Sequence, residues 1–166
     1  MKIASALVTA YRVVSHHGFA DVLENEGTGQ KSFHALASFY PGDVICPFGS
    51  RETMSKPTYL TVQTGIDRHI LLEPEFLQYI NHSCNPNVFF DTTSLQLICL
   101  KEMHAGDEMS FFYPSTEWEM TQPFNCYCES EKCLHHIQGA KHIPEEIIFQ
   151  YRLTDFIRQQ ILKRLR

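Results

Sequence analysis

Short apolar runs, separated by turn-forming residues, make up most of the sequence. Residues 11–14 (YRVV), 59–62 (YLTV) and 95–100 (LQLICL) combine β-branched, aromatic and aliphatic side chains over strand-like lengths. Glycine, proline, asparagine and aspartate mark turns between the runs, at residues 25–29, 41–43, 85–87 and 105–107. The pattern therefore predicts a mainly β fold built from short strands.

A long helical pattern occurs only near the end of the chain, over residues 144–166. Pro144 suits a first helical turn, Glu145 and Glu146 would lie at the positive end of the helix, and the basic residues at 163–166 at its negative end. Its buried side would be formed by apolar residues, namely Ile148, Tyr151, Phe156, Ile161 and Leu165. The sequence thus predicts a terminal helix.

The length and composition are those of one globular domain. A chain of 166 residues can build one real core but not a second sizeable one, and 43% hydrophobic residues is an ordinary content. No apolar run approaches the roughly 18 residues that span a bilayer, and residues 1–8 lack a signal-peptide core. We therefore expect an intracellular protein, nuclear or cytoplasmic, without membrane contact.

The net charge of −5 argues against a nucleic-acid-binding module, because such modules usually carry a basic face that neutralises phosphates. We therefore expect no direct nucleic-acid binding. An acidic surface suits a cationic partner, such as a basic protein or peptide. The charge by itself is equally consistent with a role in solubility alone.

Three of the six cysteines, Cys126, Cys128 and Cys133, form a C-x-C-x4-C cluster. In a reducing compartment this spacing favours metal ligation over disulfides, and thiolates are ligands that tetrahedral zinc prefers. A fourth ligand is then required. His135 or His136 would complete a local zinc knuckle.

Three segments of the sequence resemble a known family. Residues 81–87 read NHSCNPN, residues 106–113 read GDEMSFFY, and the cysteine cluster follows at residues 126–133. The first resembles the N-H-S-C-x-P-N signature of SET-domain protein lysine methyltransferases, the second the G-E-E-L-x-F-D-Y segment of that family, and the third its post-SET zinc-binding tail. The resemblance extends over residues 32–140.

The resemblance implies a SET-domain, β-clip-like fold of small curved sheets with a knot-like crossing near the cofactor, followed by a C-terminal helix. We divide the chain accordingly into a SET domain (residues 1–120), a post-SET zinc-binding segment (residues 121–140) and a C-terminal helix (residues 141–166). No cysteine precedes residue 46, so a cysteine-rich pre-SET region is not expected in this sequence.

The same resemblance implies transfer of a methyl group from S-adenosylmethionine to a lysine of a basic protein, such as a histone tail. Tyr113 matches the active-site tyrosine of the family, whose hydroxyl orients the amine and the methyl donor. Asn81 and His82 match residues that hold the cofactor, and Leu134 matches an apolar residue placed against the adenine. Phe111 lies two residues before Tyr113 and is expected to leave room for di- or trimethylation.

The cofactor loop departs from the family pattern. The G-x-G at residues 27–29 looks like the glycine loop of the family, but a lone G-x-G is weak evidence. The family places that loop at a regular distance before the glycine of a later turn, here Gly42. Counting this distance back from Gly42 leads to Ser32. We therefore expect the cofactor contacts to come from Lys31, Ser32, Phe33 and His34.

The resemblance also suggests a fourth zinc ligand. In the family it is the cysteine of the asparagine motif, here Cys84, which would join Cys126, Cys128 and Cys133 around Zn²⁺. Such a site would pin the tail against the cofactor site and link folding of the tail to the metal. A histidine from residues 135–136 is the alternative.

Several departures from the family pattern leave other functions open. Residues 47–50 (PFGS) lack the tyrosine and the acid of the Y-x-G-E segment, and Gln78 and Phe112 replace a common arginine and acid. A second hypothesis is therefore a binding or scaffold module that keeps the SET fold but has lost turnover. A third is a zinc-stabilised interaction protein whose C-terminal helix docks a partner.

Overall fold

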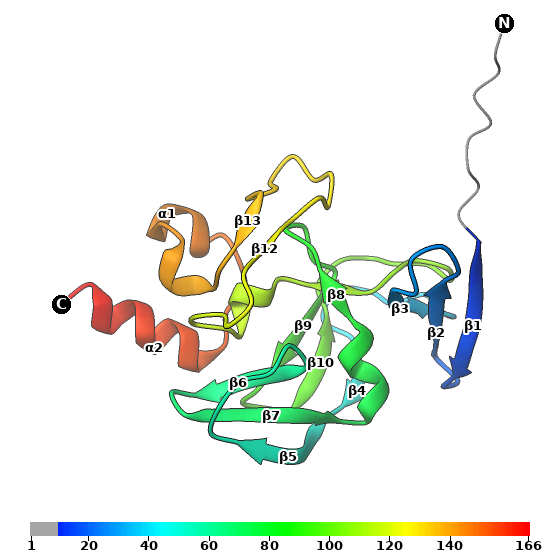
Figure 1. The fold of residues 1–166 in the computed structure, drawn as a ribbon, viewed down its shortest axis with the longest axis horizontal. Helices are drawn as coiled ribbons and strands as arrows, with labels where there is room; N and C mark the ends of the chain where they lie inside the picture. Colours follow the sequence, from blue (N-terminus) through cyan, green and yellow to red (C-terminus); the bar gives the residue numbers. More distant parts are fainter. Residues whose placement is uncertain (1–9) are drawn as a thin grey trace, which may run out of the picture.

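The computed structural model describes residues 10–166, so the signal-peptide prediction for residues 1–8 lies outside the described residues. The described chain forms three three-stranded and two two-stranded sheets, with few helices (Figure 1). The expected mainly β, SET-like fold with a C-terminal helix is confirmed. Within the same residues, no helix is long and apolar enough to cross a membrane.

The N-terminal sheet contains β1 (Tyr11–His16), β2 (Ala20–Asn25) and β3 (Lys31–Ala35) in that order, all antiparallel. The turn between β2 and β3 forms because Oδ1 of Asn25 accepts the backbone N–H groups of Gly27 and Thr28 at 2.9 and 3.1 Å. Gly29 closes the turn at a φ of 75°, which glycine adopts without steric cost. This sheet lies at the right of Figure 1, away from the C-terminal helices.

The middle of the chain builds two further antiparallel sheets. In each of them, the strand that comes last in the sequence lies at the centre. One contains β4 (Val44–Pro47), β10 (Gln96–Cys99) and β9 (Val88–Asp91), and the other β5 (Gly49–Met54), β7 (Arg68–Glu73) and β6 (Thr61–Gly65). The runs expected at residues 11–14 and 95–100 fall on β1 and β10. The run at residues 59–62 becomes a strand only from Thr61, because the Thr61 hydroxyl closes a turn on the Thr58 carbonyl at 2.9 Å.

These three sheets share one hydrophobic core. It is formed by alternate side chains of several strands, among them Ala20, Val22, Phe33, Ile70, Phe90 and Leu97. The 3₁₀ turn η1 (Glu75–Tyr79) adds Leu77 to the same core. Burial of such side chains contributes about 25 cal/mol for each Å² of apolar surface removed from water, and it fixes the position of β8, which follows η1.

Two short strand pairs complete the β structure. β8 (Asn81–His82) pairs in parallel with β11 (Ser110–Phe111), and β12 (Phe124–Asn125) pairs in antiparallel fashion with β13 (His136–Ile137). The 3₁₀ turn η2 (Tyr113–Ser115) follows β11, and η3 (Ala140–His142) follows β13. Gly139 precedes η3 at a φ of 112°, and a Cβ there would lie 2.5 Å from the carbonyl oxygen of Trp118. The segment after η2 therefore packs tightly under the start of η3.

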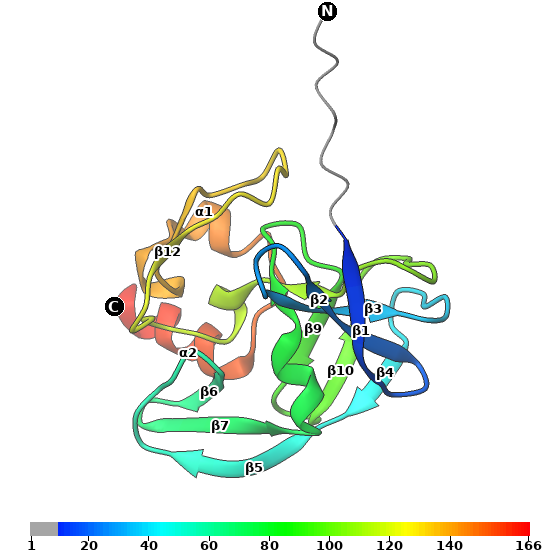
Figure 2. The same ribbon diagram turned by 45° about the vertical axis from the view of Figure 1, so that its right-hand side comes forward.

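The C-terminal segment differs from the single helix that its pattern predicts. It forms α1 (Glu145–Ile148) and α2 (Asp155–Arg164), shown in orange and red in Figures 1 and 2. α2 begins directly after Thr154, whose side chain accepts the Ile157 N–H at 3.4 Å and caps the helix. Of the predicted buried residues, Ile148 and Ile161 are fully buried in a second core, whereas Leu165 is 55% exposed, and its predicted burial is wrong.

Candidate active site and cysteine cluster

The two motif segments that the sequence singles out lie side by side. β8 and β11 pair in parallel, with Asn81 opposite Ser110 and His82 opposite Phe111. The 3₁₀ turn η2 begins at Tyr113, directly after this pairing. The short parallel pair therefore brings residues far apart in the sequence into one site, with Tyr113 beside His82.

His82 links the two segments through its ring. The backbone N–H of Tyr113 donates to Nδ1 of His82 at 3.1 Å, so Nδ1 carries no proton and the neutral ring is protonated at Nε2. Nε2 lies 3.4 Å from Sγ of Cys84. Burial lowers the pKa of His82 to about 4, because removal from water disfavours the charged form. At neutral pH the ring is therefore uncharged and joins Tyr113 to Cys84.

Asn81 holds β8 against the N-terminal sheet. Its Nδ2 donates to the backbone carbonyl of Lys31 at 2.8 Å and to Oε1 of Glu108 at 3.3 Å. The first bond fixes β8 to the start of β3, and the second fixes it to the segment that precedes β11. One side chain thus sets the relative position of three parts of the chain.

A polar cavity of about 560 Å³ lies where these three parts meet the segment after β12. Four of the residues that the sequence predicts as cofactor contacts line it, namely Ser32, Asn81, His82 and Tyr113. The sequence did not single out several other lining residues, among them Tyr11, Asn25, Glu108, Asn125 and Tyr127. Glu108 and Tyr127 belong to the motif segments at residues 106–113 and 126–133. Tyr11, Asn25 and Asn125 belong to no motif, so only the folded chain identifies them.

The remaining predicted cofactor residues lie outside the lining of the polar cavity. They are Lys31, Phe33, His34 and Leu134. Phe33 is fully buried in the main core, because successive side chains of a strand point to opposite faces and its neighbour Ser32 faces the cavity. Gly27 and Gly29 do not line the cavity either. The cofactor contacts of this segment stay a prediction, with Ser32 as the side chain placed to make one.

An apolar cavity of about 330 Å³ adjoins the polar cavity at Tyr113. Its walls are mainly aliphatic and aromatic, and include Val62, Leu72, Leu77, Ile80, Phe111 and Met120. Tyr113 and Phe124 belong to the lining of both cavities. Their ring centroids lie 5.8 Å apart with the planes inclined at 69°. These two rings therefore stand at the junction of the cavities.

Tyr113 keeps its proton throughout the physiological pH range. Burial raises the pKa of its hydroxyl to about 12, and the negative charge of Glu117 acts in the same direction. A protonated phenol can both donate and accept a hydrogen bond. The ring of Phe111 lies 4.7 Å from that of Tyr113 and 4.8 Å from that of Phe90, so Phe111 is fixed between the core and the tyrosine.

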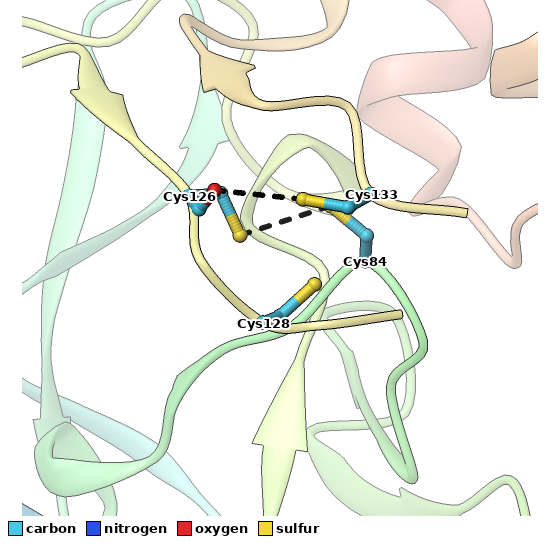
Figure 3. A group of neighbouring side chains, drawn as sticks. All are labelled: Cys84, Cys126, Cys128 and Cys133. Atoms are coloured by element: carbon cyan, nitrogen blue, oxygen red, sulfur yellow. Dashed lines mark hydrogen bonds between the residues drawn. The ribbon is translucent and has the colours of Figure 1, made fainter. Parts of the chain in front are cut away.

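Cys84, Cys126, Cys128 and Cys133 converge on one point (Figure 3). Their four Sγ atoms all lie within 4.8 Å of one another, and those of Cys84 and Cys126 are 4.0 Å apart. A tetrahedral zinc ion with sulfur ligands at about 2.3 Å places the sulfurs roughly 3.8 Å from each other. The spacing of the cysteine cluster is therefore close to that of a four-thiolate metal site.

Neither histidine considered as a fourth ligand belongs to this cluster. Nδ1 of His136 lies 3.0 Å from Oδ1 of Asn125, and His135 is exposed. The backbone N–H of Leu134 points at Sγ of Cys84 at 3.4 Å, a contact that favours the thiolate. The geometry thus favours Cys84 over either histidine.

The pKa values of the thiols indicate that the cysteine cluster requires a positively charged partner. Burial raises the pKa of Cys84 far above its usual range and that of Cys126 to about 11. Burial also raises the pKa of Cys128, but hydrogen bonds, first from the backbone of Ser130, outweigh it and lower the value to about 7. Four clustered thiolates, two of them buried, are costly without a cation. A bound metal ion would supply the positive charge that this donor set requires.

The C-terminal segment is anchored on the same site. The hydroxyl of Tyr151 donates to the backbone carbonyl of Cys84 at 2.7 Å. Its ring stacks on that of Phe112 with centroids 3.7 Å apart and planes 12° from parallel. These contacts explain why the chain is not helical between α1 and α2. They also hold the segment at residues 81–87 in place.

Comparisons with known proteins agree with this arrangement. The family model of the SET domain matches residues 30–114, from the start of the β3 segment to the residue after Tyr113. "Methyltransferase flvH" of Aspergillus flavus is 32% identical over 156 residues, which cover 93% of this chain and 87% of that protein. The paired motif segments, the family match and this relative together show that the chain belongs to the SET-domain family of methyltransferases.

Proposed function

We propose that this chain is an S-adenosylmethionine-dependent protein lysine N-methyltransferase. The observation that supports this best is the meeting of a polar and an apolar cavity at Tyr113. Transfer of a methyl group requires the donor carbon and the accepting nitrogen to be in contact and in line. Two cavities that share Tyr113 in their linings provide such a meeting point.

The polar cavity is our proposed site for the methyl donor. Asn81 and His82 would hold its polar ends, together with Ser32 and backbone groups of Lys31, Phe33 and His34. Glu108 lies in the same lining, and its negative charge suits the cationic groups of S-adenosylmethionine. Leu134, close to the cysteine cluster, would approach the adenine from the tail. When bound, the donor supplies a methyl group activated by a positively charged sulfur.

The apolar cavity is our proposed site for the lysine side chain. A free lysine amine has a pKa near 10.4, so making it neutral near pH 7.5 costs about 4 kcal/mol. Aliphatic and aromatic walls disfavour the ammonium form and lower this cost. Val62, Leu72 and Ile80 provide such walls, and they suit the methylene chain that precedes the amine.

At the junction, the hydroxyl of Tyr113 would orient the amine. The neutral nitrogen attacks the methyl carbon, the new N–C bond forms as the C–S bond breaks, and the sulfur keeps the electron pair. Tyr113 is protonated at neutral pH, so its hydroxyl can accept from the amine N–H while its own proton is directed elsewhere. Its role is therefore to position the reacting atoms and not to remove a proton.

Phe111 would set the number of methyl groups added. Its ring touches Tyr113 and lines the apolar cavity, and it has no hydroxyl that could hold a water molecule beside the amine. A methylated amine therefore has room to turn for a further transfer. We infer that the enzyme forms di- or trimethyllysine, on a basic protein such as a histone tail.

The four cysteines would hold one structural Zn²⁺ that fixes the wall of the donor site. Cys126, Tyr127 and Cys128 line the polar cavity, so an ordered tail completes that cavity. On this basis we treat residues 1–120 as the SET domain, residues 121–140 as the post-SET zinc segment and residues 141–166 as the C-terminal segment that supports both.

Label transfer tests this function. The zinc-loaded protein is incubated with methyl-labelled S-adenosylmethionine and an extract of cells that lack the protein, and the protein and small-molecule fractions are then separated. We expect label on lysine in the protein fraction, and far less of it with Tyr113→Phe. Label found only on small amines would support methyl transfer but would contradict the proposal that the substrate is a protein. Cofactor binding without any transfer would favour the alternative of a scaffold module without turnover.

A further inference from the structure

A carboxylate lies in the wall of the apolar cavity. Glu117 follows η2, where its backbone N–H donates to the carbonyl of Tyr113 at 3.0 Å, and its side chain lines the cavity beside Phe111 and Tyr113. The surrounding walls are largely aliphatic and aromatic. An unpaired charge in such surroundings is costly, so the presence of a carboxylate there calls for a partner.

The protein binds one of the two oxygen atoms of this carboxylate. Oε2 of Glu117 accepts the backbone N–H of Gln63 at 2.9 Å and the hydroxyl of Thr116 at 2.7 Å. Gln63 in turn accepts the backbone N–H of Trp118 at 2.9 Å, which fixes the position of the whole group. Within residues 10–166, no donor and no salt-bridge partner reaches Oε1. Glu117 is only partly buried and lines the cavity, so its second oxygen, Oε1, is the one that a ligand in the cavity could pair with.

The protein places no cation near this carboxylate. The lining of the apolar cavity contains no lysine, arginine or histidine among the described residues, and its titratable members besides Glu117 are Tyr59, Tyr113 and Glu119. Glu119 is exposed and pairs with Lys141 at 3.0 Å and His142 at 3.6 Å. The cations contributed by η3 are therefore directed to Glu119 and not to Glu117.

The strand behind Glu117 supplies no cation either. His69 on β7 lies opposite Gln63 on β6. Burial lowers the pKa of His69, so this ring is neutral at neutral pH. The turn η1 contributes Leu77 and Gln78 to the cavity, and neither carries a charge. Any cation that pairs with Glu117 in this cavity would therefore be supplied by a ligand.

We propose that Glu117 receives the substrate amine in the apolar cavity as an ammonium ion and accepts its proton before methyl transfer. This inference rests on the proposed function, in which that cavity holds an amine. The N–H bond of the ammonium breaks, an O–H bond forms at Oε1, and the nitrogen keeps the electron pair that then attacks the methyl carbon. The methylated product leaves as a cation, and the proton on Glu117 returns to solvent.

The acid strength of Glu117 is consistent with this role. Burial raises the pKa of its carboxyl to about 7, in spite of the hydrogen bonds from Gln63 and Thr116, which act in the opposite direction. Efficient proton transfer requires an acceptor whose pKa lies near the working pH. Glu117 is therefore better matched to an amine than an ordinary surface carboxylate.

A binding experiment separates this role from catalysis as a whole. Zinc-loaded wild type and Glu117→Gln are titrated with n-butylammonium chloride and with n-butanol, and amide NMR shifts of residues lining the cavity are followed. We expect Glu117→Gln to weaken n-butylammonium binding about tenfold, the effect of one ionic contact of roughly 1.4 kcal/mol, and to leave n-butanol binding unchanged. Equal weakening of both probes, or of neither, overturns the proposal.

Two control variants address charge and folding. Glu146→Gln removes an exposed charge on α1 and should change neither titration. Thr116→Val removes one hydrogen bond to the same carboxylate oxygen but keeps the charge, so it should lower thermal stability and still distinguish n-butylammonium from n-butanol. Loss of that distinction in Thr116→Val would assign the effect to packing and would contradict the proposal.

A pH profile tests the proton transfer on a verified substrate. The turnover of Glu117→Gln should be lowest relative to wild type near neutral pH, and should approach wild type toward about pH 10, where lysine amines become neutral in solution. A loss by the same factor at every pH would show that Glu117 acts only on structure. The proposed function itself fails in a different way, with no transfer by wild type to any amine.

Discussion

The backbone N–H of Tyr113 donates to Nδ1 of His82 at 3.1 Å, and the two rings lie 5.1 Å apart in an edge-to-face contact. Because Nε2 of the same imidazole faces Sγ of Cys84, the junction of the two cavities is connected to the cysteine cluster through a single side chain. A change at the metal site is therefore expected to reach Tyr113.

Tyr113→Phe tests the role of the hydroxyl. The ring would keep its contacts with His82 and Phe111, so the fold and the affinity for S-adenosylmethionine should change by only a few-fold. Turnover should fall by roughly a hundredfold, because the hydroxyl that positions the amine is lost. Single-turnover kinetics and calorimetric titration of the cofactor measure the two effects. Tyr40→Phe, an exposed tyrosine, is the matched control, and equal rates for the two variants would refute the assignment.

Removal of the metal should loosen the tail. We expect about one zinc ion per chain by elemental analysis, since four thiolates form a closed structural site. Chelation should weaken cofactor binding, because Cys126, Tyr127 and Cys128 line the polar cavity. Cys84→Ser should lose zinc and His135→Ala should retain it. The reverse result would replace Cys84 with a histidine ligand.

Phe111→Tyr tests the number of methyl groups added. A hydroxyl placed beside Tyr113 would hold water near the amine and restrict its rotation after the first transfer. The wild type should form di- or trimethyllysine, and Phe111→Tyr should stop earlier while staying active. A barrier change of about 1.4 kcal/mol alters the relative rate tenfold. Mass spectrometry of a time course decides, and only monomethyl product from the wild type with excess cofactor would contradict the prediction.

The position of the cofactor segment can be tested with a bound methyl donor. We expect the segment from Lys31 to His34 to contact the donor, with the Ser32 side chain in the cavity that it already lines. Residues 27–29 should make no contact. A cofactor-bound crystal structure measures these distances. Direct contact from Gly27 or Gly29, with Ser32 remote, would refute the alignment.

Glu117 should give the stability an unusual pH dependence. Its pKa is about 7 in the folded chain against about 4.3 when unfolded, so between these values the folded state binds the extra proton. The contribution of this carboxyl to the free energy of unfolding is therefore highest below about pH 4, and it falls as the pH rises to about 7. Urea unfolding of Glu117→Gln and wild type should show the variant gaining up to roughly 3 kcal/mol relative to wild type across this range. A constant difference would show that the carboxyl has an ordinary pKa.

Local sequence patterns determined the strand content, the motifs at residues 81–87 and 106–113, and the cysteine cluster. These features depend on side-chain alternation, on turn chemistry and on the spacing of chemically distinctive residues, all of which are visible along the chain. The residues Ser32, Asn81, His82 and Tyr113, expected from the family resemblance, do lie together around one cavity.

The tertiary structure alone decided the rest. The parallel pairing of β8 with β11 depends on contacts distant in sequence. The family resemblance suggested Cys84 as the fourth member of the cysteine cluster, but only the folded chain brings it to the tail in preference to a histidine. The helical pattern after Pro144 is interrupted because the stacking of Tyr151 on Phe112 outweighs local helix preference. Nothing next to Glu117 in the sequence marks it, because its chemistry comes from burial and from the absence of a cation in the cavity around it. Environment of this kind is set by packing and not by residue order.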